Sequence, residues 1–469
     1  MSKYTFVAAM YLLAGSLIAW AGKFGAHVDY ATGTEPHALA VADFNGDGKI
    51  DLVTASAYDT VSILLGNGDG TFQPHVDYGT GPLSEPFSVA VGDFNSDGKL
   101  DLVTANFANF FGGSVSVLLG KGDGTFQNYV QYATGGLPTS VAVGDFNRDG
   151  TPDLAVGFEQ GTTVSVLLGK GDGTFQAPAE YDTGSAPLFV AVGDFNVDGN
   201  DDLVTANYPS DVVTVLLGKG DGTFPTHVSY TTGDEPEWVA VGDLNGDRKA
   251  DLAVANFNSA TVSVLLGNGD GTFQAHMDQV AGSFPNSLAI GDINGDLGQD
   301  LVVTNLRIDS VKVLLGEGDG TLRPRETFKT DPCSGGNLCV RSVVIKDFNE
   351  DGAPDLAVAN DFDSTVSVLM NTGGTFLVTT SSSNPSKFGQ PVMFTTTVTP
   401  SIGSGRIPMG TVTFKDGSTT LGTAQLFNGQ ASLTTSSLTV GDHSIRALYS
   451  GNTSFNPNVA QPITQTVVP

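Results

Sequence analysis

The stretch ADFNGDGKIDLV (residues 42–53) recurs in variant form along most of the chain. Asp43, Asn45 and Asp47 stand two positions apart and a glycine follows, as in the opening of a helical calcium-binding loop. That loop requires a glutamate at its twelfth position, which here is Thr54. Runs rich in Val, Ile, Leu and Thr flank the stretch, and such residues favour β-strands. The pattern therefore indicates either an ion-binding turn between strands or an acidic turn without an ion.

The motif D-x-N-x-D recurs with a period near 50 residues. An apolar run such as SVAVGDF precedes each copy, and DLVTAN-like and SVSVLLG-like runs, a GKGDGTF turn and a QNYVQYATG-like segment follow it. Short alternating or β-branched runs between Gly/Asp turns predict four strands per repeat. Four-stranded units of this length are typical of propeller blades, so seven units predict a seven-bladed β-propeller. The seven copies begin at Asp43, Asp93, Asp145, Asp194, Asp243, Asp292 and Asp347.

The two ends of the repeat array complement each other. FGAHVDYATG (residues 24–33) copies FQPHVDYGTG (residues 72–81), so it is a fourth strand that lacks the first three. The seventh repeat has no such segment after Phe376. We therefore expect the N-terminal strand to complete blade seven, which would remove two open sheet edges.

The period stops near Leu377, where the composition turns to Ser, Thr and Val. Alternating segments such as PVMFTTTVTP and GTVTFKDG predict a small antiparallel β-sandwich. The chain is therefore expected to be all-β and to divide into a signal peptide (1–21), a propeller (22–376) and a sandwich (377–469).

The N-terminus has the features of an export signal. An apolar run extends from Tyr4 to Trp20, and Ala19-Trp20-Ala21 has the small-x-small form of a cleavage site. The run is slightly short for a membrane span of about 18 residues, so a cleaved signal peptide is favoured over an uncleaved anchor. We expect a protein that is extracellular, at the cell surface or in the periplasm, with no membrane insertion after cleavage.

Cys333 and Cys339 are the two cysteines of the chain. A disulfide that closes this one loop is expected in an exported protein, and two reduced thiols are the alternative.

The charge balance limits the possible partners. The chain has 50 Asp and Glu against 21 Lys and Arg, which gives a net charge of −29. This charge repels nucleic acid and anionic membranes, so no nucleic-acid partner is expected. Because 40% of the residues are hydrophobic, the acidity does not indicate disorder.

The DFNGDGKIDLV-like and LLGNGDGTF-like units resemble FG-GAP (VCBS) repeats, the calcium-bearing propeller also seen at the head of integrin α chains. The C-terminal segments SSSNPSKFGQPVMFTTTVTP, GTVTFKDGSTTLGTAQL and YSGNTSFNPN resemble bacterial immunoglobulin-like repeats. The two resemblances imply a calcium-binding propeller followed by an Ig-like domain.

Each repeat places oxygen-bearing side chains at positions one, three, five and nine of its turn. Hard oxygen ligands at this spacing, with a backbone carbonyl at position seven, suit Ca²⁺. No cysteine and no convergent histidine accompanies them, which disfavours zinc and copper. An Asx-rich turn without an ion is the alternative, although three like charges in one turn repel one another. We therefore expect up to seven structural calcium sites. The predicted ligands are Asp43, Asn45, Asp47 and Asp51; Asp93, Asn95, Asp97 and Asp101; Asp145, Asn147, Asp149 and Asp153; Asp194, Asn196, Asp198 and Asp202; Asp243, Asn245, Asp247 and Asp251; Asp292, Asn294, Asp296 and Asp300; and Asp347, Asn349, Asp351 and Asp355.

Position six distinguishes two of the repeats. Repeats five and six have Arg248 and Leu297 where the others have glycine, and repeat six has Gly298 one place later, which would allow a shifted turn. If position six requires a positive φ, a residue other than glycine costs about 1 kcal/mol. We therefore expect weaker calcium binding in repeats five and six. The glycines of the other repeats are Gly48, Gly98, Gly150, Gly199 and Gly352.

Catalytic motifs are not evident. A Ser-His-Asp site needs three groups within hydrogen-bond reach, and no residue pattern nominates a nucleophile. The GKGDGTF turns differ from phosphate-binding loops because no Lys-Ser/Thr follows, and Asp69 and its equivalents are expected to cap these turns. We therefore expect no enzyme. Four histidines share one repeat position on different blades and are interpreted as surface or packing residues: His27, His75, His227 and His276.

Ligand contacts are expected at the face opposite the acidic turns, because residues there differ between otherwise similar blades. Packing between blades is the alternative explanation of its aromatic residues. Trp238 and the insertion NFFGG (residues 109–113) are the most site-like features. The candidates are Tyr58, Phe107, Phe158, Tyr208, Phe257 and Phe362 after strand two, and His37, Phe87, Thr139, Leu188, Glu237, Trp238 and Asn286 on strand one.

The expected function is non-catalytic binding or adhesion to an extracellular protein or glycan by a monomer, with the sandwich as a spacer or second contact module. A carbohydrate-active enzyme or its accessory module is one alternative, and a purely structural surface module is another.

Overall fold

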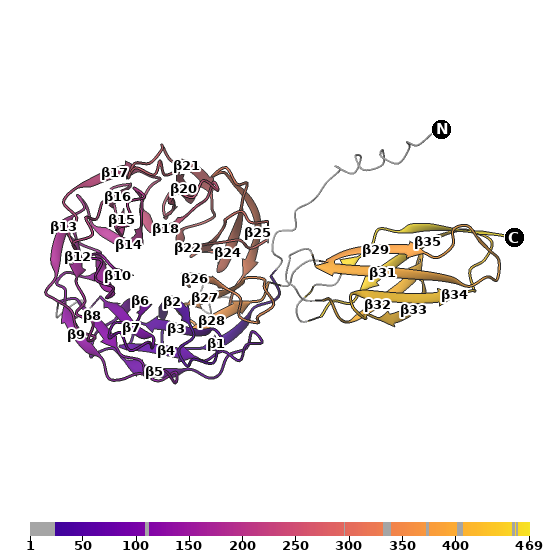
Figure 1. Ribbon diagram of the computed structural model, residues 1–469, viewed down its shortest axis with the longest axis horizontal. Coiled ribbons are helices and arrows are strands. Elements are labelled where there is room, and N and C mark those ends of the chain that lie inside the picture. Colours follow the sequence, from indigo (N-terminus) through magenta and orange to yellow (C-terminus); the bar gives the residue numbers. More distant parts are fainter. Residues whose placement is uncertain are drawn as a thin grey trace, which may run out of the picture.

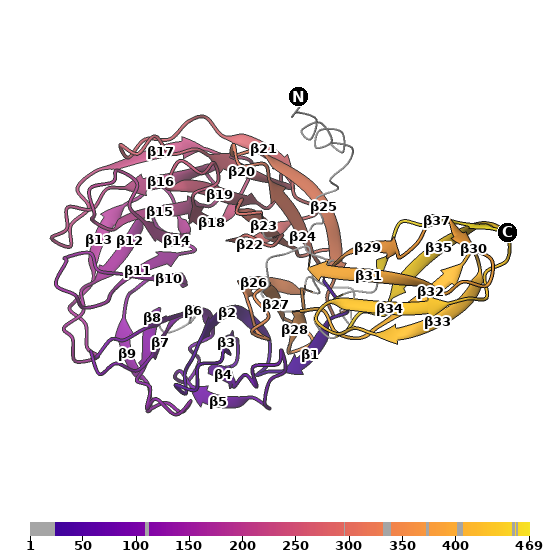
Figure 2. The same cartoon turned by 45° about the vertical axis from the view of Figure 1, so that its right-hand side comes forward.

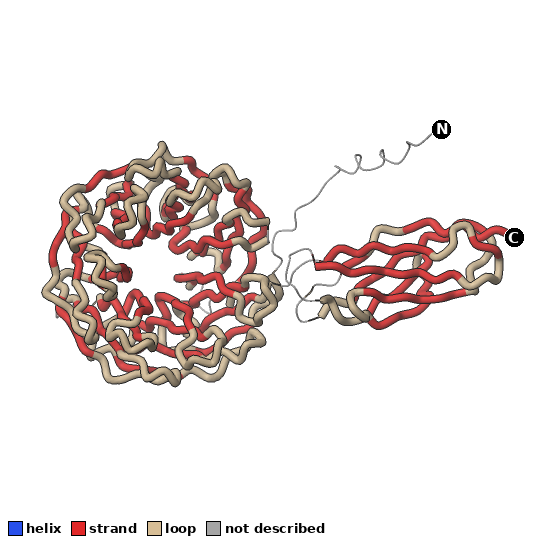
Figure 3. The backbone as a smooth tube through the Cα atoms, in the orientation of Figure 1, coloured by secondary structure: helices blue, strands red, loops and turns tan. Residues whose placement is uncertain are grey.

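The computed structural model describes residues 24–107, 112–294, 296–331, 339–371, 375–400, 407–452, 455 and 458–469. The predicted signal peptide (1–21) lies outside the described residues. Strands fall into seven four-stranded sheets arranged as a ring and two further sheets toward the C-terminus (Figure 1). No helix occurs among the strands, turns and loops of the described ranges, as the tube in Figure 3 also shows. The predicted all-β class is confirmed.

Six of the blades are consecutive antiparallel meanders. Blade one consists of β2 (Pro36–Ala42), β3 (Asp51–Ser56), β4 (Thr60–Leu64) and β5 (Val76–Gly79); blade two of β6 (Pro86–Gly92), β7 (Asp101–Asn106), β8 (Ser114–Leu118) and β9 (Val130–Ala133); blade three of β10 (Pro138–Gly144), β11 (Asp153–Phe158), β12 (Thr163–Leu167) and β13 (Ala179–Asp182). Blade four consists of β14 (Pro187–Gly193), β15 (Asp202–Asn207), β16 (Val212–Leu216) and β17 (His227–Thr231); blade five of β18 (Pro236–Gly242), β19 (Asp251–Asn256), β20 (Thr261–Leu265) and β21 (Met277–Val280); blade six of β22 (Pro285–Gly291), β23 (Asp300–Asn305), β24 (Ser310–Gly316) and β25 (Leu322–Lys329).

Blade seven joins the two ends of the propeller. Its sheet contains β26 (Val340–Lys346), β27 (Asp355–Asn360), β28 (Thr365–Leu369) and the N-terminal strand β1 (Val28–Ala31). β1 pairs antiparallel with β28, with Val28 opposite Val368 and Ala31 opposite Thr365. The prediction that the N-terminal strand closes blade seven is therefore confirmed, and the turned view shows β1 beside β28 (Figure 2).

The hydrophobic cores lie between neighbouring blades. The second strand of each blade is buried at every position, because it is covered by the adjoining blade on each side. This explains why these strands contain adjacent apolar residues, such as Leu52 and Val53, instead of a strict alternation of apolar and polar residues. The phenylalanine of each GDGTF turn packs in T-shaped contacts, as where Phe126 meets Phe44 of the preceding blade at 5.7 Å between ring centroids. These turns therefore contribute to blade packing.

The C-terminal strands form two sheets with a core of their own. One sheet has the order β29 (Thr375–Ser381), β31 (Val392–Pro400), β34 (Gln430–Thr435). The other has the order β30 (Ser386–Lys387), β37 (Ile463–Val468), β35 (Gly441–Tyr449), β32 (Thr411–Asp416), β33 (Thr419–Gln425), with β36 (Asn458–Val459) against β35. Phe394 and Phe414, one from each sheet, are fully buried in the shared core. The predicted Ig-like sandwich is confirmed.

Cys339 immediately precedes β26 and is buried and disulfide-bonded. Cys333, the other cysteine of the sequence, lies outside the described residues, as does most of the loop that the expected bridge would close.

Candidate functional site

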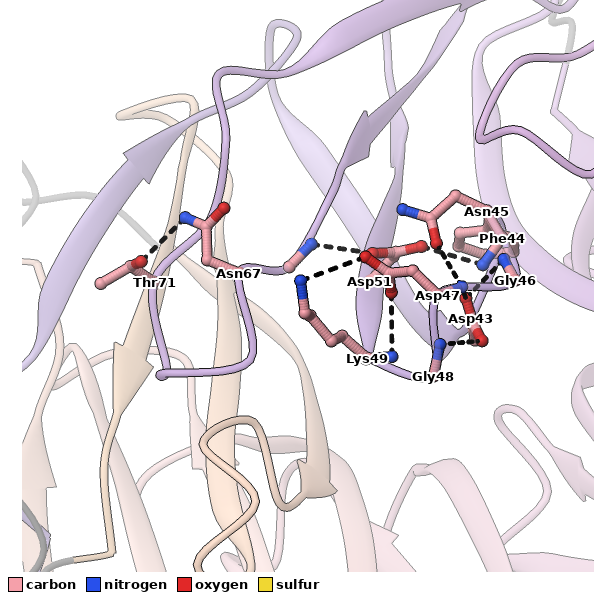
Figure 4. A network of polar contacts seen from close by, with 11 residues as sticks. Asp43, Phe44, Asn45, Gly46, Asp47, Gly48, Lys49, Asp51, Asn67 and Thr71 are labelled. Atoms are coloured by element: carbon pink, nitrogen blue, oxygen red, sulfur yellow. Dashed lines mark hydrogen bonds and ion pairs between the residues drawn. The ribbon is translucent and has the colours of Figure 1, made fainter.

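The turn between the first two strands of each blade contains the predicted calcium ligands. In blade one, the Asp43 carboxylate accepts hydrogen bonds from the backbone N–H of Gly46 at 2.8 Å, Asp47 at 3.2 Å and Gly48 at 2.8 Å (Figure 4). Asn45 Oδ1 accepts from Asp47 N at 2.9 Å. The side chains at positions one and three therefore fold the turn around their own oxygens.

The aspartate at position nine is the first residue of the second strand, as predicted, and it is fully buried. Asp51 Oδ2 accepts from Phe44 N at 2.9 Å, and Asp51 Oδ1 accepts from Gly66 N at 2.7 Å. The carboxylate thus joins the acidic turn to the GNGDGTF hairpin. The same two contacts recur in every blade, at Asp101, Asp153, Asp202, Asp251, Asp300 and Asp355. The sequence predicts this residue as a calcium ligand but does not reveal that its carboxylate links the two turns by hydrogen bonds.

The aspartate at position nine has a raised pKa. Burial raises the pKa of Asp51, and the charges of Asp43 and Asp47 raise it further, against the hydrogen bonds from the backbone. The same causes raise the pKa of Asp300 to about 7 and that of Asp355 to about 8. The carboxylates of one turn are therefore close enough to repel one another, which is the situation that a bound cation relieves.

In the described part of the chain, the residues of each acidic turn suit Ca²⁺ in their chemistry but are not arranged around a common ion position. Carboxylate and amide oxygens are the ligands that Ca²⁺ prefers, and each turn supplies four side chains that bear them. Within the part of the chain that the structure describes, however, no three His, Cys, Asp or Glu side chains are arranged so that they could hold a metal ion. Their oxygens are directed to backbone N–H groups instead. Calcium binding therefore remains a prediction from donor type and spacing, with electrostatic repulsion as its structural support.

Backbone dihedrals revise the comparison between repeats. Position six has a positive φ throughout, including φ 66° at Arg248 and φ 72° at Leu297. The sixth turn is not shifted, because Leu297 N donates to Asp292 Oδ2 at 2.9 Å as its glycine counterparts do. Position four also has a positive φ in the six repeats where the structure describes it, a requirement that sequence reasoning missed. Four repeats meet it with residues other than glycine, namely Ser96, Arg148, Val197 and Glu350. Strain is thus not confined to repeats five and six.

The histidines of the outer strands have local acidic partners. His27, His75 and His276 each place Nδ1 2.8–2.9 Å from an oxygen of the aspartate two residues later. A serine of the neighbouring strand donates to the same aspartate, as Ser62 does to Asp77 at 2.6 Å. The serine therefore contacts the acid and not the imidazole, an order that does not form a nucleophilic triad. In the hairpin, Asp69 Oδ1 accepts from Thr71 N at 3.0 Å, which confirms the expected cap.

Aromatic residues on the opposite face divide into packed and exposed members. Phe158 is 4% exposed and belongs to an inter-blade core, and Phe107 contacts Phe87 at 4.9 Å between centroids. In contrast, Tyr58 and Phe362 are 65% and 50% exposed. Part of the insertion at 109–113 lies outside the described residues. Packing therefore explains Phe158 and Phe107, and ligand contact stays a prediction for the exposed residues.

Sequence reasoning missed a charged group at this face. Arg341 Nε donates to Asp361 Oδ2 at 2.8 Å, and Asp361 Oδ1 lies 3.8 Å from His37 Nε2. Burial lowers the pKa of His37 to about 4, so the imidazole is neutral at pH 7. No local pattern links these residues, because they meet across the junction of blades seven and one.

The ring of seven four-stranded sheets defines a β-propeller, and each of its blades carries the same acidic turn. An Ig-like sandwich follows the propeller. The FG-GAP-like repeat family matches residues 43–104, 106–156, 152–205, 194–254, 243–303 and 292–358, which together make up more than half of the chain. The chain therefore belongs to the FG-GAP-like repeat family. The bacterial Ig-like domain (group 3) matches residues 378–468.

Solved structures share the propeller architecture. The chain is similar to the periplasmic gluconolactonase PpgL of Pseudomonas aeruginosa, with 17% identity and a TM-score of 0.51 over 70% of this chain and 88% of that one. It is also similar to BBS1N in its complex with ARL6DN, with 12% identity and a TM-score of 0.51 over 74% of this chain and 96% of that one. No curated protein matches the chain in sequence. At these identities the likeness concerns the fold alone.

Across the described ranges, no helix has the length and apolarity that a bilayer crossing requires.

Proposed function

We propose that this chain is an exported protein whose propeller binds a protein or glycan at or outside the cell surface without catalysing a reaction. The observation that carries the proposal is the combination of FG-GAP-like repeats with a bacterial Ig-like domain, since both are typical of extracellular binding or surface proteins. The Ig-like sandwich acts as a spacer or as a second contact module, and the chain acts as a monomer.

Calcium is the structural ion of the propeller in this proposal. The side chains at positions one, three, five and nine of each turn would hold it, which in blade one are those of Asp43, Asn45, Asp47 and Asp51. An ion that binds only the folded turns stabilises the propeller by mass action. Extracellular oxygen-ligand sites bind calcium at about 10⁻⁴ to 10⁻³ M, so the ion would be bound in an extracellular medium and released by a chelator.

A paired screen tests the function. The full chain is applied to a glycan array and to an array of extracellular proteins, and is assayed for turnover of acidic polysaccharides and lactones. Each assay is run with calcium and with chelator. Binding without turnover supports the proposal, and turnover of any of these substrates would replace it with an enzymatic function. A chain that neither binds nor turns over any of them is a purely structural module.

A further inference from the structure

The innermost strand of every blade begins with the same irregularity. In blade one, Pro36 lies opposite Ser56 and Ala38 lies opposite Ala55, so His37 is an extra residue without a partner in the ladder. The register shifts at the same place in blades two to six, and in blade seven it shifts between Val340 and Val343, a gap that includes Arg341. A β-bulge turns the side chain of its extra residue away from the ladder, and bulges are frequent beside binding sites. We call these residues the bulge ring: His37, Phe87, Thr139, Leu188, Glu237, Asn286 and Arg341.

The bulge ring varies where its surroundings repeat. Proline precedes the bulge in six blades and a Val-Ala-Val-Gly-like run follows it, yet the bulge residue itself differs in all seven. Blade geometry alone would favour one residue type at such a position. The difference between blades therefore indicates that the seven residues together form one binding surface. Seven equivalent sites, one in each blade, would favour the same residue in every blade.

Members of the ring contact the next blade. The His37 ring lies 4.3 Å from that of Phe87, centroid to centroid. Thr139 Oγ1 donates to the Leu188 carbonyl at 2.6 Å, and Asn286 Nδ2 donates to the Arg341 carbonyl at 3.1 Å. The innermost strands lie around the centre of the propeller (Figure 1), so these contacts bring side chains of different blades to one surface.

Blade seven has an ion pair with a buried acid at this surface. Asp361 is 2% exposed, and Arg341 Nε is its hydrogen-bonded counter-ion. Replacing a buried ion pair with apolar residues is often neutral or stabilising, and blades two and five have Phe107 and Phe257 at the position of Asp361. The pair is therefore poorly explained by stability.

Hydrogen-bonding capacity is left over at this junction. Asp361 Oδ1 and His37 Nδ1 are buried without a hydrogen-bond partner. Among the described residues, Arg341 donates through Nε alone, and its side chain is 34% exposed, so the Nη donors are open to a ligand. Unsatisfied buried acceptors are costly, so the retention of this one beside open donors calls for an explanation.

We propose that the bulge ring binds a neutral saccharide, with Arg341 as the group that recognises its hydroxyls and Asp361 as the residue that positions Arg341. This inference rests on the proposed binding function. Hydroxyls of the sugar accept from the Nη groups of Arg341, and the buried Asp361 carboxylate fixes the orientation of that guanidinium through its bond to Nε. Glu35, Glu85 and Glu235, which directly precede the bulge segments, make a polyanionic glycan a poor occupant.

Trp238 supplies a spectroscopic test. It follows Glu237 of the bulge ring and stacks on Phe189 at 3.9 Å, and the other tryptophan of the chain is Trp20. In a Trp20→Phe background, the fluorescence of Trp238 is titrated with glucose, galactose, mannose, xylose and their oligomers, and calorimetry gives the affinities. At least one neutral saccharide is expected to bind and to change the emission. Arg341→Gln and Asp361→Asn are each expected to weaken that binding about tenfold or more, as loss of a hydrogen bond to a charged group does.

Controls separate the site from folding and from general charge. Arg323→Gln removes the same kind of Nε–carboxylate pair, formed with Glu317 on the opposite face, and should leave binding unchanged. Circular dichroism and thermal melting show whether Arg341→Gln folds. If it does not, Arg341→Lys and Glu237→Gln replace it, and each of these variants should also weaken binding.

The outcomes distinguish this inference from the proposed function. Saccharide binding that these variants do not weaken would overturn the ring site and leave the binding function standing. Binding of glucuronate or of a basic peptide alone would overturn the neutral-saccharide assignment and leave the function standing. Binding of no glycan and no protein would overturn both.

Discussion

Ser367 Oγ donates a hydrogen bond of 2.6 Å to Asp29 Oδ1, although the two residues are 338 positions apart in the sequence. The same Ser–Asp contact occurs within blade one, where Ser62 donates to Asp77 at 2.6 Å. Blade seven thus uses a segment from the far end of the chain to reproduce a contact that blade one makes locally. The N-terminal strand is a full member of that blade.

Removal of residues 24–33 is expected to abolish the cooperative melt of the propeller. The deletion exposes the edge of β28 and removes Phe24 from the core between blades six and seven. Differential scanning calorimetry and light scattering should show loss of the transition and aggregation. A chain that lacks only residues 1–21 is the control. An unchanged melt of the 24–33 deletion would contradict the closure by β1.

The sequence predicts this architecture well because its signals are local and repeated. Turn residues and apolar runs recur in each blade, so the strand that begins at Asp51 and the closing strand near Val28 are both recognisable from the pattern. The site is less predictable. The contacts of the Asp51 carboxylate with Phe44 and Gly66 depend on how two turns meet. The positive φ at position four gives no clear sequence signal, because residues such as Val197 occupy that position instead of glycine.

Contacts between blades carry no local signal at all. Arg341 lies on β26 and Asp361 directly follows β27 of the same blade, and His37 of blade one approaches Asp361 because the ring closes. A sequence pattern can mark position 37 as variable between repeats, but it does not say which side chains share its surroundings. The ion pair of blade seven is therefore visible in the structure alone.

Calcium removal is expected to lower the melting temperature of the propeller, because bound ions stabilise only the folded turns. Calorimetric titration should detect the binding of calcium to the chain, and Asp43→Asn should reduce the number of calcium ions that the chain binds. Asp69→Asn is the matched control, since Asp69 caps the hairpin of the same blade with no role in the acidic turn. The absence of any calcium-dependent shift in melting would refute the predicted sites.

Leu297→Gly is expected to stabilise the chain by about 1 kcal/mol, since φ is 72° at this position and glycine adopts that conformation without a steric penalty. Leu297 is 89% exposed, so the substitution removes little packing. Chemical denaturation measures the change. Leu297→Ala retains Cβ and should gain nothing, and a destabilised glycine variant would show that the side chain has contacts of its own.

Glu237→Gln is expected to stabilise the chain at pH 8 and to have little effect at pH 4. Burial raises the pKa of Glu237 to about 7, from 4.5 in the unfolded chain, and the charge of Glu235 raises it while that of Arg341 lowers it. The folded state therefore holds a proton between these two pKa values that the unfolded state releases. Stability is lost as the pH rises from about 4.5 through 7, by an amount on the order of 3 kcal/mol.

The side-chain amide introduced by E237Q does not titrate, so this loss of stability should be absent from the variant. The advantage of E237Q over the parent should grow between about pH 4.5 and 7 and then level off. Melting temperatures at closely spaced pH values measure the difference between the two proteins, which cancels the titration of the other acids. Glu159→Gln, at an exposed glutamate of the same face, is the control and should show no such trend. A difference that stays constant with pH would show that the pKa of Glu237 is the same in the folded and the unfolded chain.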